Sequence, residues 1–162
     1  MMPKLLIVYH SLTGGTEAMA QAAFAGAEGV VDVSLKRAGD AGAEDLLAAD
    51  GYIFAAPENL ASMAGVMKDF FDRTYYPALG RIEGRPYAVT ICAGSDGEGA
   101  ARQIARIATG WRLRAVADPL IICTHAQTPE AILAPKRIDD ADLAKCRDLG
   151  AAIANGLAMG VF

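Results

Sequence analysis

Short apolar runs alternate with longer segments of helical periodicity along most of the chain. The runs rich in β-branched residues predict strands, and they cover residues 5–9, 30–35, 50–56, 85–93 and 115–124. The last of them is interrupted by Pro119, which cannot donate a hydrogen bond to a neighbouring strand. Segments with helical spacing of apolar residues predict helices, and they cover residues 17–27, 43–49, 64–75, 100–113 and 139–157.

This alternation of strands and helices favours an α/β fold with a parallel sheet covered on both faces. Right-handed crossovers between parallel strands place helices on the two sides of such a sheet. No internal repeat or linker divides the chain, so we expect residues 1–162 to form a single domain. In open parallel sheets, ligands bind outside the carboxyl ends of the strands, where the strand order reverses. The loops that follow the strands are therefore the first place to look for a site.

Composition narrows the class of protein. The chain of 162 residues is 53% hydrophobic and 21% charged, which is typical of a globular protein with a full core. A net charge of −4 offers no basic stripe for nucleic acid. No apolar segment reaches membrane-spanning length, and the N-terminus does not resemble a signal peptide. We expect a cytoplasmic protein with no membrane partner, whose three cysteines are reduced.

The loop after the first predicted strand has the features of a phosphate-binding site. It consists of Ser11, Leu12, Thr13, Gly14, Gly15 and Thr16, directly before a predicted helix. A helix N-terminus offers unpaired amides and the positive end of the helix dipole, both of which favour an anion. The glycines allow close backbone approach, and the hydroxyls add donors. Because the loop has no Lys or Arg, we expect neutral groups alone to hold the anion.

Several other phosphate chemistries are excluded by what this loop lacks. The nucleoside-triphosphate motif GxxxxGK[ST] and the dinucleotide motif GxGxxG are both absent. The Cys and Arg of a Cys-based phosphatase are also missing, as are the strand-end carboxylates of a phosphoacceptor domain. A phosphomonoester held by hydroxyls and amides remains, beside the alternative of an ordinary turn that caps a helix.

Two further loops should meet the first one at the same edge of the sheet. Each is rich in Gly, Ser, Asn or Asp and follows a predicted strand. The candidate binding residues are Pro57, Glu58, Asn59, Leu60 and Met63 after the third strand, and Ala93, Gly94, Ser95, Asp96 and Gly99 after the fourth.

These three stretches resemble the flavodoxin-like superfamily, especially flavodoxins and the NAD(P)H-dependent FMN reductases. SLTGGT resembles the family's phosphate loop, and residues 93–99 resemble its third flavin loop. Residues 63–73, MAGVMKDFFDR, are similar to the helix that follows the second flavin loop in the reductase branch. The resemblance covers nearly the whole chain. It implies a flavodoxin-like three-layer sandwich whose five-stranded parallel sheet has the order 2-1-3-4-5.

The resemblance also implies a function. FMN would be the cofactor, with NADPH or NADH as electron donor, and a small molecule or a redox protein as acceptor. A homodimer is a further expectation. The second loop lacks the aromatic residue that commonly stacks on the flavin, so the ring would pack against Leu60 and Met63, or against Tyr9 or His10. A single-electron carrier and a binding module without cofactor remain as alternatives to a reductase.

Overall fold

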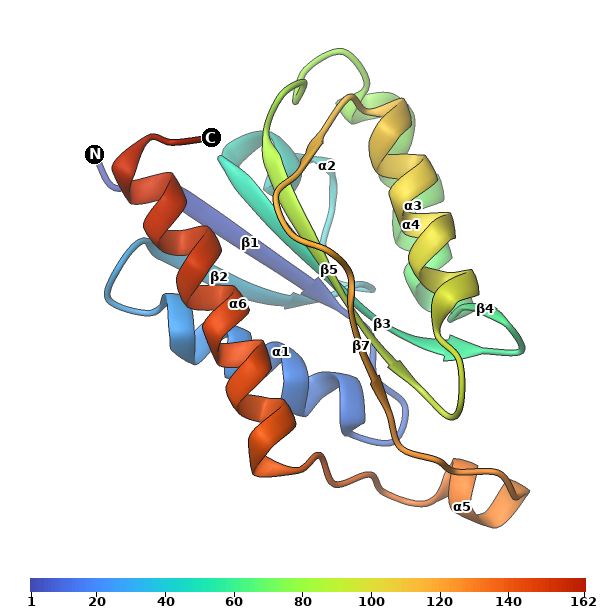
Figure 1. Cartoon of the computed structure of the whole chain (residues 1–162). Coiled ribbons are helices and arrows are strands. Elements are labelled where there is room, and N and C mark those ends of the chain that lie inside the picture. The colour runs from blue at the N-terminus through green and yellow to red at the C-terminus, as the bar shows by residue number, and fades with distance from the viewer.

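The five predicted strand regions form one sheet whose main strands are parallel (Figure 1). The computed structural model describes residues 1–162. Its strand order is β2 (Asp32–Arg37), β1 (Lys4–Tyr9), β3 (Gly51–Asn59) and β5 (Pro86–Ala93), followed by β6 (Arg114–Ala115) and β7 (Leu120–Cys123), which both pair with β5. Pro119 lies where the last two strands are separated. Because β6 and β7 share the fifth position, the predicted order 2-1-3-4-5 is confirmed.

A small hairpin adds an antiparallel strand that the sequence pattern did not indicate. Strand β4 (Ser62–Met63) folds back on the end of β3 through a two-residue turn at Leu60 and Ala61. Both turn residues have positive φ, 52° and 64°. Turns of this geometry usually contain Gly or Asn, since these residues tolerate the left-handed conformation. Gly and Asn are both absent from these two positions, so the sequence pattern does not predict the hairpin.

Helices cover both faces of the sheet as predicted. Helices α1 (Gly15–Ala27) and α6 (Asp140–Met159) lie on one face, and α3 (Gly65–Ala78) and α4 (Glu98–Gly110) on the other (Figure 1). Helix α2 (Ala43–Ala48) packs with α3. A short helix that was not predicted, α5 (Pro129–Leu133), follows β7 beyond the carboxyl ends of the strands (Figure 1).

The larger part of the core lies under α2, α3 and α4 and is built around one phenylalanine. Phe54 of β3 contacts five other aromatic rings at centroid distances of 5.2–6.5 Å, those of Tyr52, Phe70, Phe71, Tyr87 and Trp111. Trp111, Phe54 and Phe70 are fully buried. Aromatic pairs at such distances stabilise a core beyond the area that they bury. The rings thus fix β3 and β5, whose ends carry two of the candidate loops.

On the opposite face, α1 and α6 approach each other at their backbones. A Cβ atom at Gly26 would collide with the carbonyl oxygen of Arg147, and one at Gly150 with that of Ala23. Glycine is therefore required at both positions by space rather than by backbone angle. The close contact holds the C-terminal half of α1 firmly against α6.

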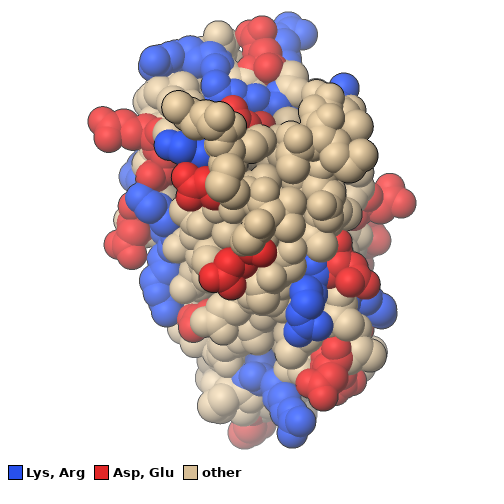
Figure 2. Space-filling view, turned by 90° about the vertical axis from the view of Figure 1, so that its left-hand side faces the viewer, with Lys and Arg blue, Asp and Glu red and all other residues tan.

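On the face shown in Figure 2, charged side chains of both signs surround a broad uncharged area and form no patch of one sign. Figure 2 shows the face at the left of Figure 1, where Lys and Arg are interspersed with Asp and Glu. This distribution agrees with the mild net charge of −4. None of the helices combines the length and apolar composition needed to cross a membrane.

Candidate functional site

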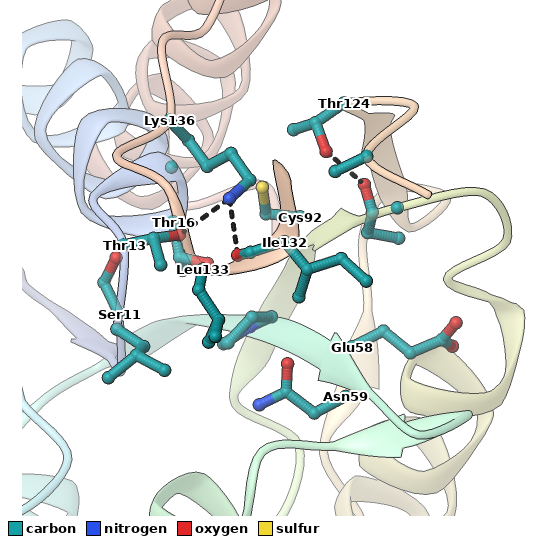
Figure 3. Close-up of a pocket in the computed structure, with 16 residues that line it drawn as sticks. Ser11, Thr13, Thr16, Glu58, Asn59, Cys92, Thr124, Ile132, Leu133 and Lys136 are labelled. Carbon is teal, nitrogen blue, oxygen red and sulfur yellow. Dashed lines mark hydrogen bonds between the residues drawn. The ribbon is translucent and has the colours of Figure 1, made fainter. Parts of the chain in front are cut away.

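A pocket lies at the carboxyl ends of the strands, where the loops after β1, β3, β5 and β7 meet (Figure 3). It is lined by Ser11, Leu12, Thr13, Gly15, Thr16, Pro57, Glu58, Asn59, Cys92, Ala93, Gly94, Thr124, Ala126, Ile132, Leu133 and Lys136. Its volume is about 90 Å³, smaller than typical ligand pockets of about 300–1,000 Å³. The cavity can therefore enclose a small group, whereas a larger ligand must extend through the mouth.

The structure brings most of the sequence-predicted site residues together. Ten of the sixteen line the pocket, namely Ser11, Leu12, Thr13, Gly15, Thr16, Pro57, Glu58, Asn59, Ala93 and Gly94. The other six do not line it, namely Gly14, Leu60, Met63, Ser95, Asp96 and Gly99. Gly14 shapes the loop without lining it: its φ is 97°, and its amide donates to Ser11 Oγ at 3.1 Å.

The two residues expected to cover a flavin ring face elsewhere. Leu60 is fully exposed at the tip of the hairpin, and Met63 is 5% exposed and packs into the larger core. Neither residue lines the pocket. Leu60 lies in the turn that was not predicted and points outward, whereas Met63 lies in β4 and points into the core. Tyr9 and His10 do not line the pocket either.

The third loop contributes fewer residues to the pocket than expected, because its second half forms the N-terminus of helix α4. Asp96 Oδ1 accepts a hydrogen bond from the amide of Glu98 at 3.2 Å. Gly99 lies inside α4, where a Cβ atom would collide with the carbonyl oxygen of Ala61. Ser95 lies in the bend between β5 and this helix. Only Ala93 and Gly94 of the predicted loop reach the pocket.

The first loop and the start of α1 form a cradle of donors. The hydroxyl-bearing residues Ser11, Thr13 and Thr16 all line the pocket, and Thr16 is only 2% exposed. The amides of residues 15–17 make no hydrogen bond within the chain, as is usual in the first turn of a helix. A Cβ atom at Gly15 would lie 2.8 Å from Cys92 Sγ, so the glycine is needed for the strand and the cradle to approach. These groups can surround an anion.

A lysine far away in the sequence completes this cradle. Lys136, in the loop between α5 and α6, lines the pocket, with its Nζ 3.5 Å from Thr13 Oγ1 (Figure 3). Its backbone amide donates to the carbonyl oxygen of Thr13 at 2.8 Å, which fixes the loop against the cradle. The expectation that neutral groups alone surround the site is therefore wrong. No periodicity or motif around residue 136 indicated this position.

Cys92 forms part of the inner wall and behaves as a neutral thiol. Burial raises its pKa, and this effect exceeds the opposite influence of the nearby Lys136 ammonium and of a hydrogen bond with Thr16. A protonated thiol is a poor nucleophile. Cys92 therefore shapes the wall and supports Thr16, and we assign it no catalytic step.

Glu58 caps helix α4 instead of projecting into the pocket. Its Oε1 accepts from the amide of Gly97 at 2.8 Å, and its Oε2 accepts from the amide of Ala100 at 3.1 Å. Figure 3 shows its carboxylate directed away from Lys136. A carboxylate at a helix N-terminus is stabilised by unpaired amides and the helix dipole. The carboxylate of Glu58 thus holds the second and third loops together, while a contact of this residue with a cofactor stays a prediction.

Replacement of Glu58 by glutamine should lower the free energy of unfolding by about 1–2 kcal/mol, because one accepting oxygen and the charge are lost at a half-exposed position. Urea denaturation measures this change. Glu98→Gln is the matched control, since Glu98 also lies in the first turn of α4 but its side chain accepts no hydrogen bond. Equal losses in the two variants would contradict the capping role.

The mouth of the pocket is aliphatic. Leu12 and Leu133 are 73% and 67% exposed, and Ile132 is 49% exposed beside them. No aromatic residue lines the pocket. Exposed aliphatic side chains around a polar cradle are typical of a site that binds a ligand with one charged end and one flat apolar part.

Comparisons with known proteins agree with this geometry. A model of the NADPH-dependent FMN reductase family matches residues 36–127. A flavodoxin of Aquifex aeolicus is 34% identical over 100 residues, which are 60% of this chain and 54% of the relative. An NAD(P)H dehydrogenase (quinone) of Acidithiobacillus ferrooxidans is 34% identical over 95 residues, 45% of this chain and 48% of the relative. The matched stretch thus spans about half the length of these relatives.

The fold similarity extends over almost the whole chain. The solved structure of a flavodoxin from the domain Archaea superposes with a TM-score of 0.76 at 25% identity. The superposition covers 95% of this chain and 98% of the other. The first loop lies outside the family match at residues 36–127.

Proposed function

The chain belongs to the NADPH-dependent FMN reductase family, and from this premise we propose that it is an FMN-binding oxidoreductase that uses NADPH or NADH as electron donor. The observation that carries the proposal is the cradle at the start of α1. Hydroxyl groups, unpaired amides and the Lys136 ammonium converge there, and no carboxylate is directed into it. This donor set fits a phosphate group.

The residues present also fit the rest of FMN. The cradle would hold the phosphate inside the small cavity, and the ring system would lie in the mouth against Leu12, Ile132 and Leu133. Asn59 also lines the pocket, below Ile132 and Leu133 in the view of Figure 3, and its amide can bond to polar atoms at the edge of a flavin.

The protein's contribution to the reaction is binding and orientation. When bound, FMN supplies the redox chemistry, taking electrons from the nicotinamide and passing them to an acceptor. The aliphatic side chains of the mouth would exclude water from one side of a bound ring, and the hairpin carries Leu60 away from the pocket. No side chain of the pocket has to act as a nucleophile. The acceptor would be a small molecule or a redox protein.

Similarity to flavodoxins over the whole chain supports a second candidate, a single-electron carrier. The two functions differ in their direct reaction with nicotinamides. We expect the purified protein, incubated with FMN and freed of excess ligand, to show the absorption bands of an oxidised flavin. In anaerobic titration these bands should bleach rapidly with NADPH or NADH.

Slow or absent bleaching of a bound flavin would favour the carrier. Absence of flavin bands after incubation with FMN would overturn both candidates and leave a binding module without cofactor. The same titration run with each nicotinamide in parallel determines the preferred donor.

A further inference from the structure

Lys136 is a cation placed beside the positive end of a helix with no carboxylate to balance it. The five ion pairs of the chain do not include it. Its neighbours in the pocket are the hydroxyls of the cradle and the thiol of Cys92. Two positive groups that converge without a counter-charge repel each other, so an anion bound between them would be favoured by both.

The lysine is held in this position by both its backbone and its side chain. Its Nζ donates to the carbonyl oxygen of Ile132 at 2.6 Å (Figure 3). It also donates to the carbonyl oxygen of Ala134 at 2.7 Å, at the end of α5. The third donor of the ammonium faces Thr13 Oγ1 at 3.5 Å, the longest and therefore the weakest of its three hydrogen bonds. The third donor is therefore directed toward the cradle before any ligand binds.

A single ammonium adds a full positive charge, which hydroxyls and amides do not provide. Neutral donors already favour the phosphate dianion over the monoanion, and a positive charge adds a Coulomb attraction that is about twice as strong for the dianion. The second pKa of a phosphomonoester is about 6, so both forms are present near neutral pH in free solution.

We propose that Lys136 is the specificity-determining residue of this pocket. Its charge makes the pocket select a doubly charged phosphomonoester and so distinguish FMN from riboflavin. The proposal rests on the proposed FMN site. It assigns most of the charge discrimination to a residue that lies outside the phosphate loop and more than a hundred positions beyond it in the chain.

The test compares FMN and riboflavin binding by fluorescence titration in wild type, Lys136→Gln and Lys136→Arg. Lys136→Gln should weaken FMN binding roughly ten- to a hundredfold, the loss expected for one charge-assisted hydrogen bond, and change riboflavin binding less than about twofold. Lys136→Arg should recover most of the lost affinity. Lys145→Gln is the matched control for net charge, because Lys145 is exposed on α6 and pairs with Asp142; its FMN affinity should equal that of wild type.

A second measurement reads the charge of the bound phosphate. In ³¹P NMR at saturating FMN, the wild-type complex should keep a dianionic phosphate to a lower pH than free FMN does. The Lys136→Gln complex should titrate at a higher pH than the wild-type complex, because the ammonium that favours the dianion is gone. A lysine that merely holds α5 in place would not produce this shift.

The outcomes separate the two proposals. Equal losses for FMN and riboflavin in Lys136→Gln would show that the lysine only supports α5, and unchanged FMN affinity would show that neutral groups suffice; either result overturns the role of Lys136 and leaves the FMN site intact. Failure of wild type to bind FMN at all would overturn the proposed function itself, and this inference with it.

Discussion

Alanine at both Thr13 and Thr16 is expected to weaken FMN binding roughly a hundredfold or more while leaving riboflavin binding nearly unchanged. Each hydroxyl would donate a hydrogen bond to an ionised phosphate, and such bonds contribute about 1.5–3 kcal/mol each. Both threonines line the cavity, and Thr16 is almost completely buried, so little water is available to replace the lost donors. Fluorescence titration with both ligands measures the difference.

Thr109→Ala provides the control for this double variant. Its hydroxyl donates to the carbonyl oxygen of Ala105 within α4 and lies outside the pocket, so FMN affinity should stay at the wild-type value. Equal losses of FMN and riboflavin in the double variant would place the phosphate elsewhere. Urea denaturation of the same samples shows whether the loss of the bond between Thr16 and Cys92 also affects folding.

The second large effect concerns stability and arises from the contact between α1 and α6. Valine at Gly150 should lower the free energy of unfolding by about 3 kcal/mol or more, because the new side chain collides with the backbone of α1 at Ala23 and the helices must separate. Urea denaturation measures the loss. The N-terminus of α1 would also shift, so FMN affinity should fall even at temperatures where the variant remains folded.

Gly65→Val is the matched control for this change. Gly65 is the first residue of α3, and an added Cβ atom there meets nothing within 4 Å. Its stability should remain within about 0.5 kcal/mol of wild type. If valine at Gly150 were tolerated as well as valine at Gly65, the glycine contact would not hold the two helices together.

The sequence was sufficient to predict the sheet because its strands are buried on both faces. Residues 5–9 are a continuous apolar run and residues 86–93 are apolar except for Thr90, which is the pattern that burial between two helical layers requires. Pro119 correctly marked the break in the fifth strand, since it removes a donor from the ladder. The three loops were placed at one edge by topology alone, without knowledge of any side-chain contact.

The remaining features of the site depend on contacts between distant residues. Lys136 belongs to no predicted strand and to no recognisable motif. Only the packing of the α5–α6 loop on Thr13 brings it to the cradle. The role of Glu58 could not be foreseen because it requires the start of α4 to lie beside the hairpin. Helix α5 did carry a signal: Thr128 accepts from the amide of Ala131 as an N-cap, and Pro129 follows it.

The two borders of the sheet limit how copies of this protein can associate. On one border, Lys36 and Arg37 of β2 form ion pairs with Asp45 and Glu17, so charged side chains flank this edge. On the other, β6 and β7 are short and separated at Pro119. Charged or proline-interrupted edges resist the addition of a foreign strand, which protects against aggregation. A homodimer would therefore form through helices or the mouth of the pocket, and not by joining two sheets into one.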